Sequence, residues 1–414
     1  MKVFFIFIYL CFIVSAKRHK YSFEYASTSD SASDSSEDKE VLPFTDGYFD
    51  TRGGIRKYFA LEAALVDHGR NVICSPIAAL MPLGKLLIGA KSKGKAEQEL
   101  LDALGLKRSI QLKNAFALLV TNMLYLQGVT LDVASRIFVS TESKVNETFD
   151  RIATKLFKTS VRKIDVFNPR ETAQQINDWV ADKTRNKITK LISSSDISKD
   201  VSLIAVNAIY FAGKWKDEFD KSYTGDFHSP TGTRRIPMMS HSGKYKYWKC
   251  DVINAEVIEI PYKGSQSSMV IVLPFSNTGL TALLRTLKLS SNLLNDALEK
   301  MKYSNVLLSM PKFKIESELD LRYLYQKIGL HSIFNPVKSG LTEIIEDEEV
   351  FVSKAIHKAV IEVNEKGTKA AAVSGLVLQL ASASLNQPIF RADRPFLFYV
   401  NIYREQLFSG VFSG

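Results

Sequence analysis

The order of helix and strand signals along this 414-residue chain constrains its fold most. Apolar residues at helical spacing come first, and short β-branched or aromatic runs bounded by turn formers come later. This order, without strict alternation and without internal repeats, predicts an α+β domain rather than a doubly wound parallel sheet. The predicted helices are 61–66, 97–104, 112–126, 176–192 and 319–328, and the predicted strands are 203–211, 257–261, 269–273, 306–310, 360–363 and 396–400.

The first sixteen residues have the layout of a cleaved signal peptide. Lys2 precedes an apolar run from Val3 to Val14, and the small residues Ser15 and Ala16 follow it. The run is too short to span a bilayer stably, although a membrane anchor is the alternative. We therefore assign residues 1–16 to a signal peptide and expect a secreted, extracellular protein without a membrane partner.

Residues 17–45 form an acidic, serine-rich tail that lacks the apolar periodicity of a helix or a strand. Such a composition is typical of a flexible segment. A solvated linker is the default interpretation, and a docking arm for a basic partner is the alternative. The remaining residues, 46–414, carry the apolar patterns and are assigned to one globular domain.

The cysteines and one sequon agree with secretion. Cys11 lies in the signal peptide, so that only Cys74 and Cys250 remain, and their apolar neighbours predict buried free thiols rather than a disulfide framework. Asn146, followed by Glu147 and Thr148, is a predicted site of N-glycosylation, although such triplets also arise by chance.

The chemistry of an enzyme is missing from the sequence. The six histidines include no pair at metal-binding helical spacing, and no nucleophile-elbow motif is present. Residues 89–95 resemble a phosphate loop, but Ala96 replaces the magnesium-binding Ser or Thr and the segment follows a helical run. We therefore predict no catalytic residue, no metal site and no cofactor.

A basic stripe follows the sequon. Its four cations fall at i, i+4, i+7 and i+11, which is one face of a helix, and Lys183, Lys187 and Lys190 repeat the pattern further on. A solvated face is the default interpretation. Because the net charge is +10, a polyanion such as a glycosaminoglycan is the alternative partner. The stripe consists of Arg151, Lys155, Lys158 and Arg162.

From Asn71 onward, the chain contains a series of sequence blocks in a fixed order and spacing. The blocks are residues 71–76, 176–180, 206–215, 237–239, 260–264, 268–274, 310–316, 356–359 and 394–398. Together they resemble the serpin family. The resemblance implies the serpin fold, with three β-sheets, about eight to nine helices and an exposed reactive-centre loop, here residues 365–394. In that family the loop is attacked by a serine protease as a substrate and then inserts into the central sheet with the enzyme attached.

Residues 362–374 resemble the hinge of inhibitory serpins. In a strand, alternate side chains face opposite ways, so that Thr368 and the alternate residues after it share a small or apolar face that could enter a packed interior. Lys369, where inhibitory members usually have an acid, falls on the opposite face and can stay in water. The predicted hinge residues are Glu365, Gly367, Thr368, Ala370, Ala371 and Ala372.

The family's usual spacing from Glu365 places the scissile bond at Ala381–Ser382, and the register leaves Leu380, Ala383 and Ser384 as alternates. Ala381 suits an elastase-like protease, and Leu380 would suit a chymotrypsin-like one. Because no Lys or Arg lies between Lys369 and Arg391, a trypsin-like target is disfavoured.

Other family positions are implied as structural ones. Ser75, Asn207 and His357 match the polar cluster under the opening sheet, called the shutter. Trp215, Lys312 and Glu365 match the breach, where the loop first enters, and a Lys312–Glu365 ion pair is expected there. Three features depart from the family: Ala78 replaces a frequent Ser, Pro82 should kink or shorten its helix, and the chain ends a few residues early at Gly414.

The resemblance thus implies a monomeric inhibitor that forms a covalent complex with a serine protease and does not bind nucleic acid. The alternative is a non-inhibitory serpin that acts as a binding or carrier protein. A bulky or charged residue on the inward face of the hinge would favour that alternative, and none is present.

Overall fold

The computed structural model describes residues 54–66, 69–116, 123, 126–140, 144–290, 292–366, 387–403 and 405–414. The described residues all belong to one unit of the chain, Asp46–Gly414. The predicted signal peptide and acidic tail, residues 1–45, lie outside the described residues.

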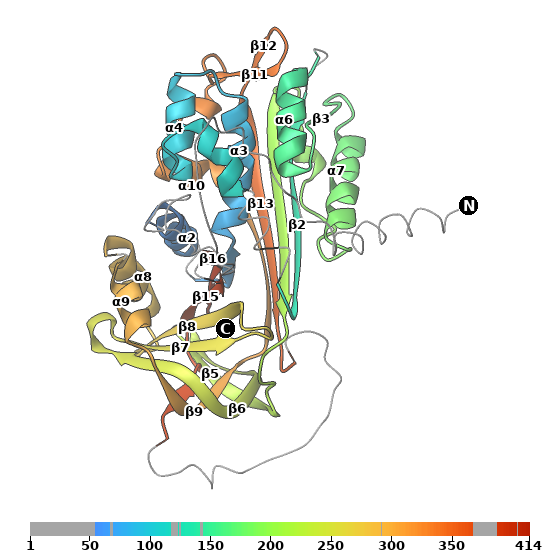
Figure 1. Ribbon diagram of the computed structural model, residues 1–414. Helices are drawn as coiled ribbons and strands as arrows, with labels where there is room; N and C mark the ends of the chain where they lie inside the picture. Colours follow the sequence, from blue (N-terminus) through green and yellow to red (C-terminus); the bar gives the residue numbers. More distant parts are fainter. Residues whose placement is uncertain are drawn as a thin grey trace, which may run out of the picture. The chain divides into compact units, whose positions relative to one another are not determined.

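The described residues form three β-sheets, shown in Figure 1. In the five-stranded sheet, two neighbouring strands run parallel at the centre and antiparallel strands flank them. The predicted α+β architecture with three β-sheets is confirmed. The order of this sheet is β10 (Phe313–Asp320), β13 (Val352–Val363), β4 (Leu203–Gly213), β2 (Val129–Val139) and β3 (Arg162–Lys163).

The nine-stranded sheet contributes most of the rest of the core, and a two-stranded sheet pairs β11 (Leu341–Ile345) with β12 (Glu348–Val350). In the nine-stranded sheet, β5 (Lys221–Ser229) pairs with β6 off the main path. The main path is β1 (Val72–Cys74), β16 (Glu405–Phe412), β15 (Phe396–Ile402), β8 (Ser267–Pro274), β7 (Ala255–Pro261), β6 (Gly232–Cys250), β9 (Lys302–Pro311) and β14 (Ile389–Arg391).

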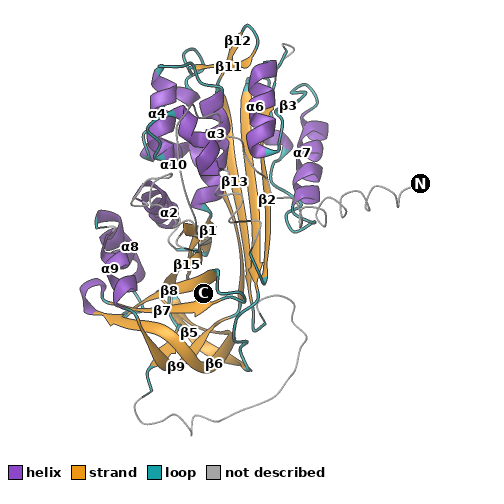
Figure 2. Cartoon of the chain, viewed as in Figure 1, coloured by secondary structure: helices purple, strands orange, loops and turns teal. Residues whose placement is uncertain are grey.

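Helices cover both faces of the five-stranded sheet, as Figure 2 shows. Helix α7 (Pro169–Lys183) packs on one face, where Val180 meets Val206 of β4. Helix α3 (Pro76–Ile88) packs on the other, where Leu83 shares a core with Ala205. Because both faces are covered, β4 is buried at every position along its length, and its sequence is apolar at almost every position.

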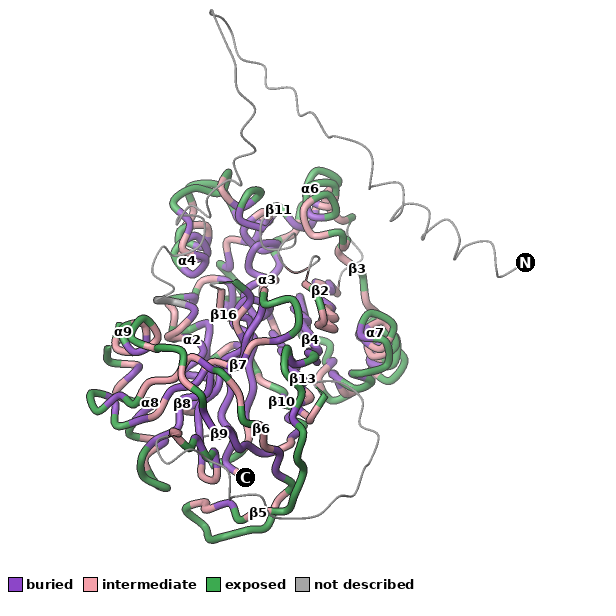
Figure 3. The backbone as a smooth tube through the Cα atoms, turned by 60° about the horizontal axis from the view of Figure 1, so that its bottom comes forward, coloured by how far each residue is buried: buried purple, intermediate pink, exposed green. Residues whose placement is uncertain are grey.

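Further helices surround these layers. Figure 3 shows that buried residues concentrate on the strands and the central helix α3, whereas α7 turns a largely exposed face to solvent. The other helices are α2 (Gly54–Val66), α4 (Lys95–Leu104), α6 (Glu147–Phe157), α8 (Leu280–Leu289), α9 (Asn292–Lys300) and α10 (Leu321–Lys327).

Helix α3 corrects one expectation. The Ser75 side chain accepts a hydrogen bond from the Ala78 backbone N–H at 3.2 Å and Pro76 occupies the first turn, so the helix begins as a well-capped one. Pro82 lies inside the helix, yet the helix runs on to Ile88. The helix is therefore not shortened at Pro82, and the other alternative, a kink there, stays a prediction.

The predicted helix over 176–192 is correct only in its first half. Helix α7 ends at Lys183, and Arg185 and Asn186 have positive φ angles of 50° and 59°. The later apolar residues belong to an extended segment that the Asn177 side chain ties back to the helix. Its Oδ1 accepts hydrogen bonds from the backbone N–H groups of Leu191 (2.8 Å) and Ile192 (3.0 Å).

The six predicted strands all lie within observed strands. The other observed strands, β1, β2, β3, β5, β6, β10, β11, β12, β14 and β16, and the helices α8 and α9 were not predicted from the sequence. At the predicted helix 319–328, Leu319 and Asp320 still belong to β10, and Asp320 caps α10 by accepting from the Arg322 N–H at 2.9 Å.

Candidate functional site

The candidate functional site is the seam between β4 and β13. The two strands are parallel neighbours, in register from Ile204 opposite Lys354 to Ala212 opposite Glu362. Beyond Val363, β13 continues through Asn364 and Glu365 into the predicted reactive-centre loop. The seam is therefore the part of the sheet that lies beside the start of that loop.

The three predicted shutter residues meet on the α3 side of the seam. Asn207 on β4 and His357 on β13 are opposite each other, and His357 Nδ1 lies 2.8 Å from Asn207 Oδ1. The backbone N–H of Ser75, at the start of α3, donates to His357 Nε2 at 3.0 Å. Because Nε2 accepts, Nδ1 carries the proton and donates to Asn207. The cluster thus joins both strands to the helix beneath them.

His357 is fully buried, and its neighbours in the cluster are neutral. Burial lowers the pKa of His357 to about 3. The imidazole is therefore uncharged at physiological pH, and the cluster is held by hydrogen bonds between neutral groups.

The three predicted breach residues gather at the end of the seam. Lys312 Nζ lies 2.8 Å from Glu365 Oε1 and also donates to Ser222 Oγ at 3.1 Å, so the expected ion pair is present. The Trp215 indole N–H donates to the Asn364 carbonyl at 2.7 Å, and its ring stacks on Tyr262 at 4.4 Å. These contacts anchor the chain where it leaves β13.

The pKa of Glu365 is lowered. Partial burial raises the pKa, but the hydrogen bonds that its carboxylate receives, first from Lys312, outweigh this effect. Glu365 is therefore ionised at neutral pH and holds Lys312 by charge as well as by hydrogen bonding.

Residues 367–386 of the predicted loop lie outside the described residues. This applies to the hinge residues Gly367, Thr368, Ala370, Ala371 and Ala372 and to Leu380, Ala381, Ser382, Ala383 and Ser384 at the predicted scissile bond. The described chain resumes at Gln387, and β14 then pairs in parallel with β9.

Polar contacts that the sequence reading missed cross the other face of the seam. The segment after α7 reaches over β4 to β13, where Lys358 Nζ donates to the Lys190 carbonyl at 2.6 Å and Lys354 pairs with Asp196. Tyr210 on β4 donates to Glu362 on β13 at 3.0 Å. We call residues 184–196 the strap, because they bridge the two strands.

One signal in the sequence could have found the strap. Lys354, Lys358 and Glu362 recur at every fourth position of a largely apolar strand, so they share one face, and this is the face that α7 covers. Charges on the covered face of a buried strand need partners, so their spacing indicates a polar element on top of it.

The predicted basic stripe does not form one helical face. Helix α6 contains Arg151 and Lys155 but ends at Phe157, where Lys158 adopts a left-handed conformation (φ 56°), and Arg162 lies on β3. The four side chains are all exposed. In the second stripe, Lys187 and Lys190 belong to the strap instead of a helix.

Asn146 and the two cysteines occupy well-defined positions. Asn146 caps α6, where its Oδ1 accepts from the backbone N–H groups of Thr148 (2.9 Å) and Phe149 (3.1 Å). Cys74 and Cys250 are buried free thiols, as predicted. Burial raises the pKa of Cys74 far above its usual range, which leaves it unreactive.

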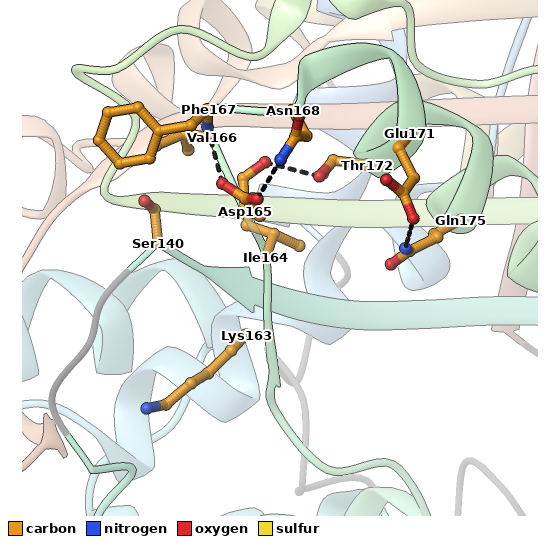
Figure 4. Close-up of a pocket in the computed structure, with 10 residues that line it drawn as sticks. All are labelled: Ser140, Lys163, Ile164, Asp165, Val166, Phe167, Asn168, Glu171, Thr172 and Gln175. Atoms are coloured by element: carbon orange, nitrogen blue, oxygen red, sulfur yellow. Dashed lines mark hydrogen bonds between the residues drawn. The ribbon is translucent and has the colours of Figure 1, made fainter.

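A separate pocket of about 460 Å³ lies beside the start of α7, as Figure 4 shows. Its polar groups bond to one another: the Asp165 carboxylate accepts from the Phe167 N–H at 2.8 Å and from Asn168 Nδ2 at 2.6 Å. The pocket lining contains neither histidine nor cysteine. Its residues are Ser140, Lys163, Ile164, Asp165, Val166, Phe167, Asn168, Glu171, Thr172 and Gln175.

Across the part of the chain that the structure describes, no group of three or more His, Cys, Asp or Glu side chains is placed to hold a metal ion. Within the same residues, no helix is both long and apolar enough to cross a membrane.

Comparison with known proteins agrees with this geometry. The family model for serpins (serine protease inhibitors) matches residues 58–413. Antichymotrypsin-2 of Bombyx mori is 36% identical over 355 residues, which cover 85% of this chain and 94% of that protein. Antitrypsin of Bombyx mori is 35% identical over 356 residues, which cover 85% of this chain and 90% of that protein. Human Serpin B8 is 31% identical over 357 residues, 84% and 94% of the two chains.

Solved structures show the same architecture. The crystal structure of Serpin48, described as a highly specific serpin of the insect Tenebrio molitor, superposes with a TM-score of 0.78 at 25% identity. The match covers 88% of this chain and 97% of that one. With its family model, its relatives and its sheet topology in agreement, the chain belongs to the serpin family.

Proposed function

We propose that this chain is a secreted inhibitor of serine proteases with a reactive-centre loop at residues 365–394, and that it traps its target by inserting the part of this loop before the scissile bond, up to Ala381, between β4 and β13. The observation that carries the proposal is the parallel pairing of these two strands beside the point where the loop begins. The proposal explains why the protein needs no catalytic group of its own.

Strand geometry makes such an insertion favourable. A segment that folds back after Glu365 would run antiparallel to β13, and therefore antiparallel to β4 as well. Its insertion would replace one parallel ladder by two antiparallel ladders, and antiparallel pairing is slightly more stable per residue. The protein would thus store conformational energy in the open loop and release it on insertion.

The loop sequence suits this role. The face that begins with Thr368 and continues through Ala370 and Ala372 is small, so burial of that face would cost no desolvated charge. Lys369 falls on the other face, toward solvent. The segment between Gly367 and Ala381 is also longer than the ladder from Ile204 to Ala212 that it would have to match.

For the target, we propose a protease with elastase-like or chymotrypsin-like specificity. The two silkworm relatives are named for chymotrypsin and for trypsin, so the family resemblance alone leaves the target open. The residues of this chain favour the first kind, because Ala381 and Leu380 are apolar and no Lys or Arg lies between Lys369 and Arg391.

In this mechanism the serine of the protease attacks the Ala381 carbonyl and forms an ordinary acyl-enzyme ester, with Ser382 at the amino end of the departing segment. Inhibition requires that loop insertion outruns hydrolysis of that ester. The protein contributes stored strain and a substrate sequence, and the protease contributes all of the chemistry.

Four finer points complete the proposal. Residues 1–16 would direct secretion, and Asn146 would carry a glycan. The inhibitor would act as a monomer. The exposed cations Arg151, Lys155, Lys158 and Arg162 remain a candidate surface for a polyanion such as a glycosaminoglycan, although they come from a helix, its end and a strand.

The test is to incubate the purified protein with pancreatic elastase, chymotrypsin and trypsin. We expect elastase or chymotrypsin to form a complex that survives boiling in detergent, and we expect a released peptide that begins at Ser382. A peptide that begins at Ala381 would make the target chymotrypsin-like. Clean cleavage with full protease activity would replace inhibition by the binding or carrier role.

A further inference from the structure

Lysine 85 occupies an unusual position on α3. The side chain is buried in the core between α3 and β2, with only 2% of the residue exposed. Its Nζ donates to the backbone carbonyl of Ser135 on β2 at 2.6 Å and lies 3.5 Å from the Ser135 hydroxyl. The Phe157 ring closes the site, with its centroid 5.6 Å from Nζ.

The backbone carbonyl of Ser135 can accept a hydrogen bond from Lys85 because the edge of β2 that faces β3 is paired along only part of its length. β3 pairs with β2 at Phe138 and Val139 alone, so the ladder between them stops before Ser135. The carbonyl instead accepts hydrogen bonds from two side chains, Lys85 and Thr159 (3.2 Å). Lys85 therefore holds β2 to the helix beneath it.

No carboxylate compensates a charge on Lys85. Among the described residues it forms no ion pair, and the charge that acts on it is the like charge of Arg136, on the opposite face of β2 over the Trp179 ring. The acidic groups on the elements that pack against α3 are engaged elsewhere: Asp132 with Arg185, Asp150 with the Val161 N–H, Glu62 with Lys288, Glu97 with the Lys93 N–H, Glu99 with Ser332, Asp102 with Gln98, Glu147 with Lys144, Glu343 with Thr342 and Glu405 with Arg56.

Lys85 is also connected to the seam. Ser135 lies opposite Asn207 in the β2–β4 ladder, and Asn207 bonds to His357 across the seam. His357 accepts in turn from Ser75, at the start of the helix that carries Lys85. One helix thus contacts the sheet twice, at the shutter through its first turn and at β2 through Lys85.

We propose that Lys85 is a pH-operated latch on β2: the neutral amine completes the packing of α3 against the strand, and the ammonium loosens that packing. A buried ammonium without a counter-ion is unfavourable, whereas a neutral amine can satisfy its hydrogen bond to the Ser135 carbonyl at little cost. Because β2 pairs with β4, the latch would set how firmly one side of the seam is held. That consequence for sheet opening rests on the proposed function, but the latch itself does not.

The direction of the pH effect follows from the burial. Burial, with a smaller contribution from Arg136, lowers the pKa of Lys85 to about 7. In the unfolded chain its pKa returns to about 10.4. Between these values the unfolded chain binds a proton that the native protein does not, so native stability rises with pH from about 7 to about 10. Stability therefore falls as the pH drops from about 10 to about 7, and below about 7 the native protein itself carries the buried ammonium.

The first experiment compares thermal unfolding of the wild type and Lys85→Met in the intact protein from pH 6 to pH 9. Methionine fills the site without a charge. We expect Lys85→Met to melt several degrees above the wild type at pH 6, and the difference to shrink steadily toward pH 9. If Lys85→Met does not fold, Lys85→Gln removes the charge and keeps a donor for Ser135.

Lys358→Met is the matched control. Lys358 is also a buried lysine that donates to a backbone carbonyl, but Glu316 lies 2.7 Å from its Nζ. Because Lys358 has this counter-ion, Lys358→Met should change the melting temperature by the same amount at pH 6 and at pH 9.

The second experiment measures hydrogen exchange of the β2 amides, residues 129–139, in the wild type and in Lys85→Met at each pH. The ratio of the two rates cancels the intrinsic effect of pH on exchange. We expect β2 to exchange several-fold faster in the wild type than in Lys85→Met at pH 6.5, and we expect this ratio to become smaller toward pH 9. A melting difference or an exchange ratio that is constant with pH would overturn the proposal. Neither measurement uses a protease, so the test of the Lys85 latch is independent of the proposed inhibitory function.

Discussion

In the middle of the seam, Ser75, Asn207 and His357 are fully buried and joined by hydrogen bonds between neutral groups, whereas at its end Lys312 and Glu365 form a charged pair whose side chains are 29% and 22% exposed. Buried neutral bonds are costly to break, because each broken bond leaves a polar group without a partner in a dry interior. A partly exposed ion pair contributes less stability, because water solvates the two charged groups when the pair breaks. The end of the seam should therefore open more easily than the middle.

His357→Ala should show the largest effect. It leaves the Asn207 carbonyl oxygen and the Ser75 N–H without their partners, and each buried unsatisfied group costs about 1–3 kcal/mol. We expect a loss of thermal stability of many degrees, measured by differential scanning calorimetry. His331→Ala, at an exposed histidine, is the control and should change stability by less than about 0.5 kcal/mol. Equal effects of the two substitutions would mean that the shutter does not hold the seam.

The pH dependence of stability should also distinguish the middle of the seam from its end. His357 is neutral in the native protein down to pH about 3 but titrates near pH 6.5 when unfolded. The unfolded chain therefore binds the additional proton in this window, and stability should fall by about 1.4 kcal/mol per unit as pH drops from 6.5 toward 3. Urea unfolding at a series of pH values should show this slope in the wild type, and His357→Gln should lack it.

Tyr210→Phe should have an intermediate effect. It removes the hydroxyl that donates to Glu362 across the seam and keeps the ring over which Lys187 lies. The loss of one hydrogen bond to a partly exposed carboxylate should cost about 1 kcal/mol, measured as a shift of the denaturation midpoint. Tyr323→Phe removes a similar bond, from the Tyr323 hydroxyl to Glu62, at a site away from the seam. Only Tyr210→Phe should speed hydrogen exchange in β4 and β13, and equal exchange in both variants would contradict a role at the seam.

Lys312→Met should have the smallest effect on stability, below about 1 kcal/mol, because its pair with Glu365 is partly exposed. The pKa of Glu365 is lowered, so the stability from this pair is present above the unfolded pKa and is lost as pH falls through the folded pKa. Below pH 4.5, the stability of Lys312→Met should therefore fall less steeply with decreasing pH than the stability of the wild type. A loss of stability as large as that of His357→Ala would contradict the contrast between middle and end.

Features with a short-range signature could be predicted from the sequence. The strand 203–211 is apolar at almost every position, because helices cover both faces of the sheet, and the capped start of α3 at Ser75 and Pro76 carries its own signal. The breach pair was expected because Lys312 and Glu365 sit in blocks that resemble those of the family. These elements depend on residues close together in the chain or on the family pattern.

Features that tertiary contacts decide could not be predicted. The apolar spacing of Ile188 and Ile192 continues that of α7, yet Asn177 draws this segment back as an extended strap. The hairpin of β5 and β6 is polar along much of one face, so its strands lack the apolar runs that marked the others. Lys85 looks like an ordinary helix residue, because nothing in its neighbourhood shows that α3 lies beneath β2.

The measurement that tests insertion most directly is the melting temperature of the protein before and after cleavage of its loop by elastase. If the loop inserts between β4 and β13, the cleaved wild type should melt far above the intact form, and so should Lys369→Arg, whose charge faces solvent. Cleaved Thr368→Arg should gain much less, because insertion would bury an unpaired guanidinium at a cost of several kcal/mol. An unchanged melting temperature in the cleaved wild type, or an equal rise in both variants, would contradict insertion into the seam.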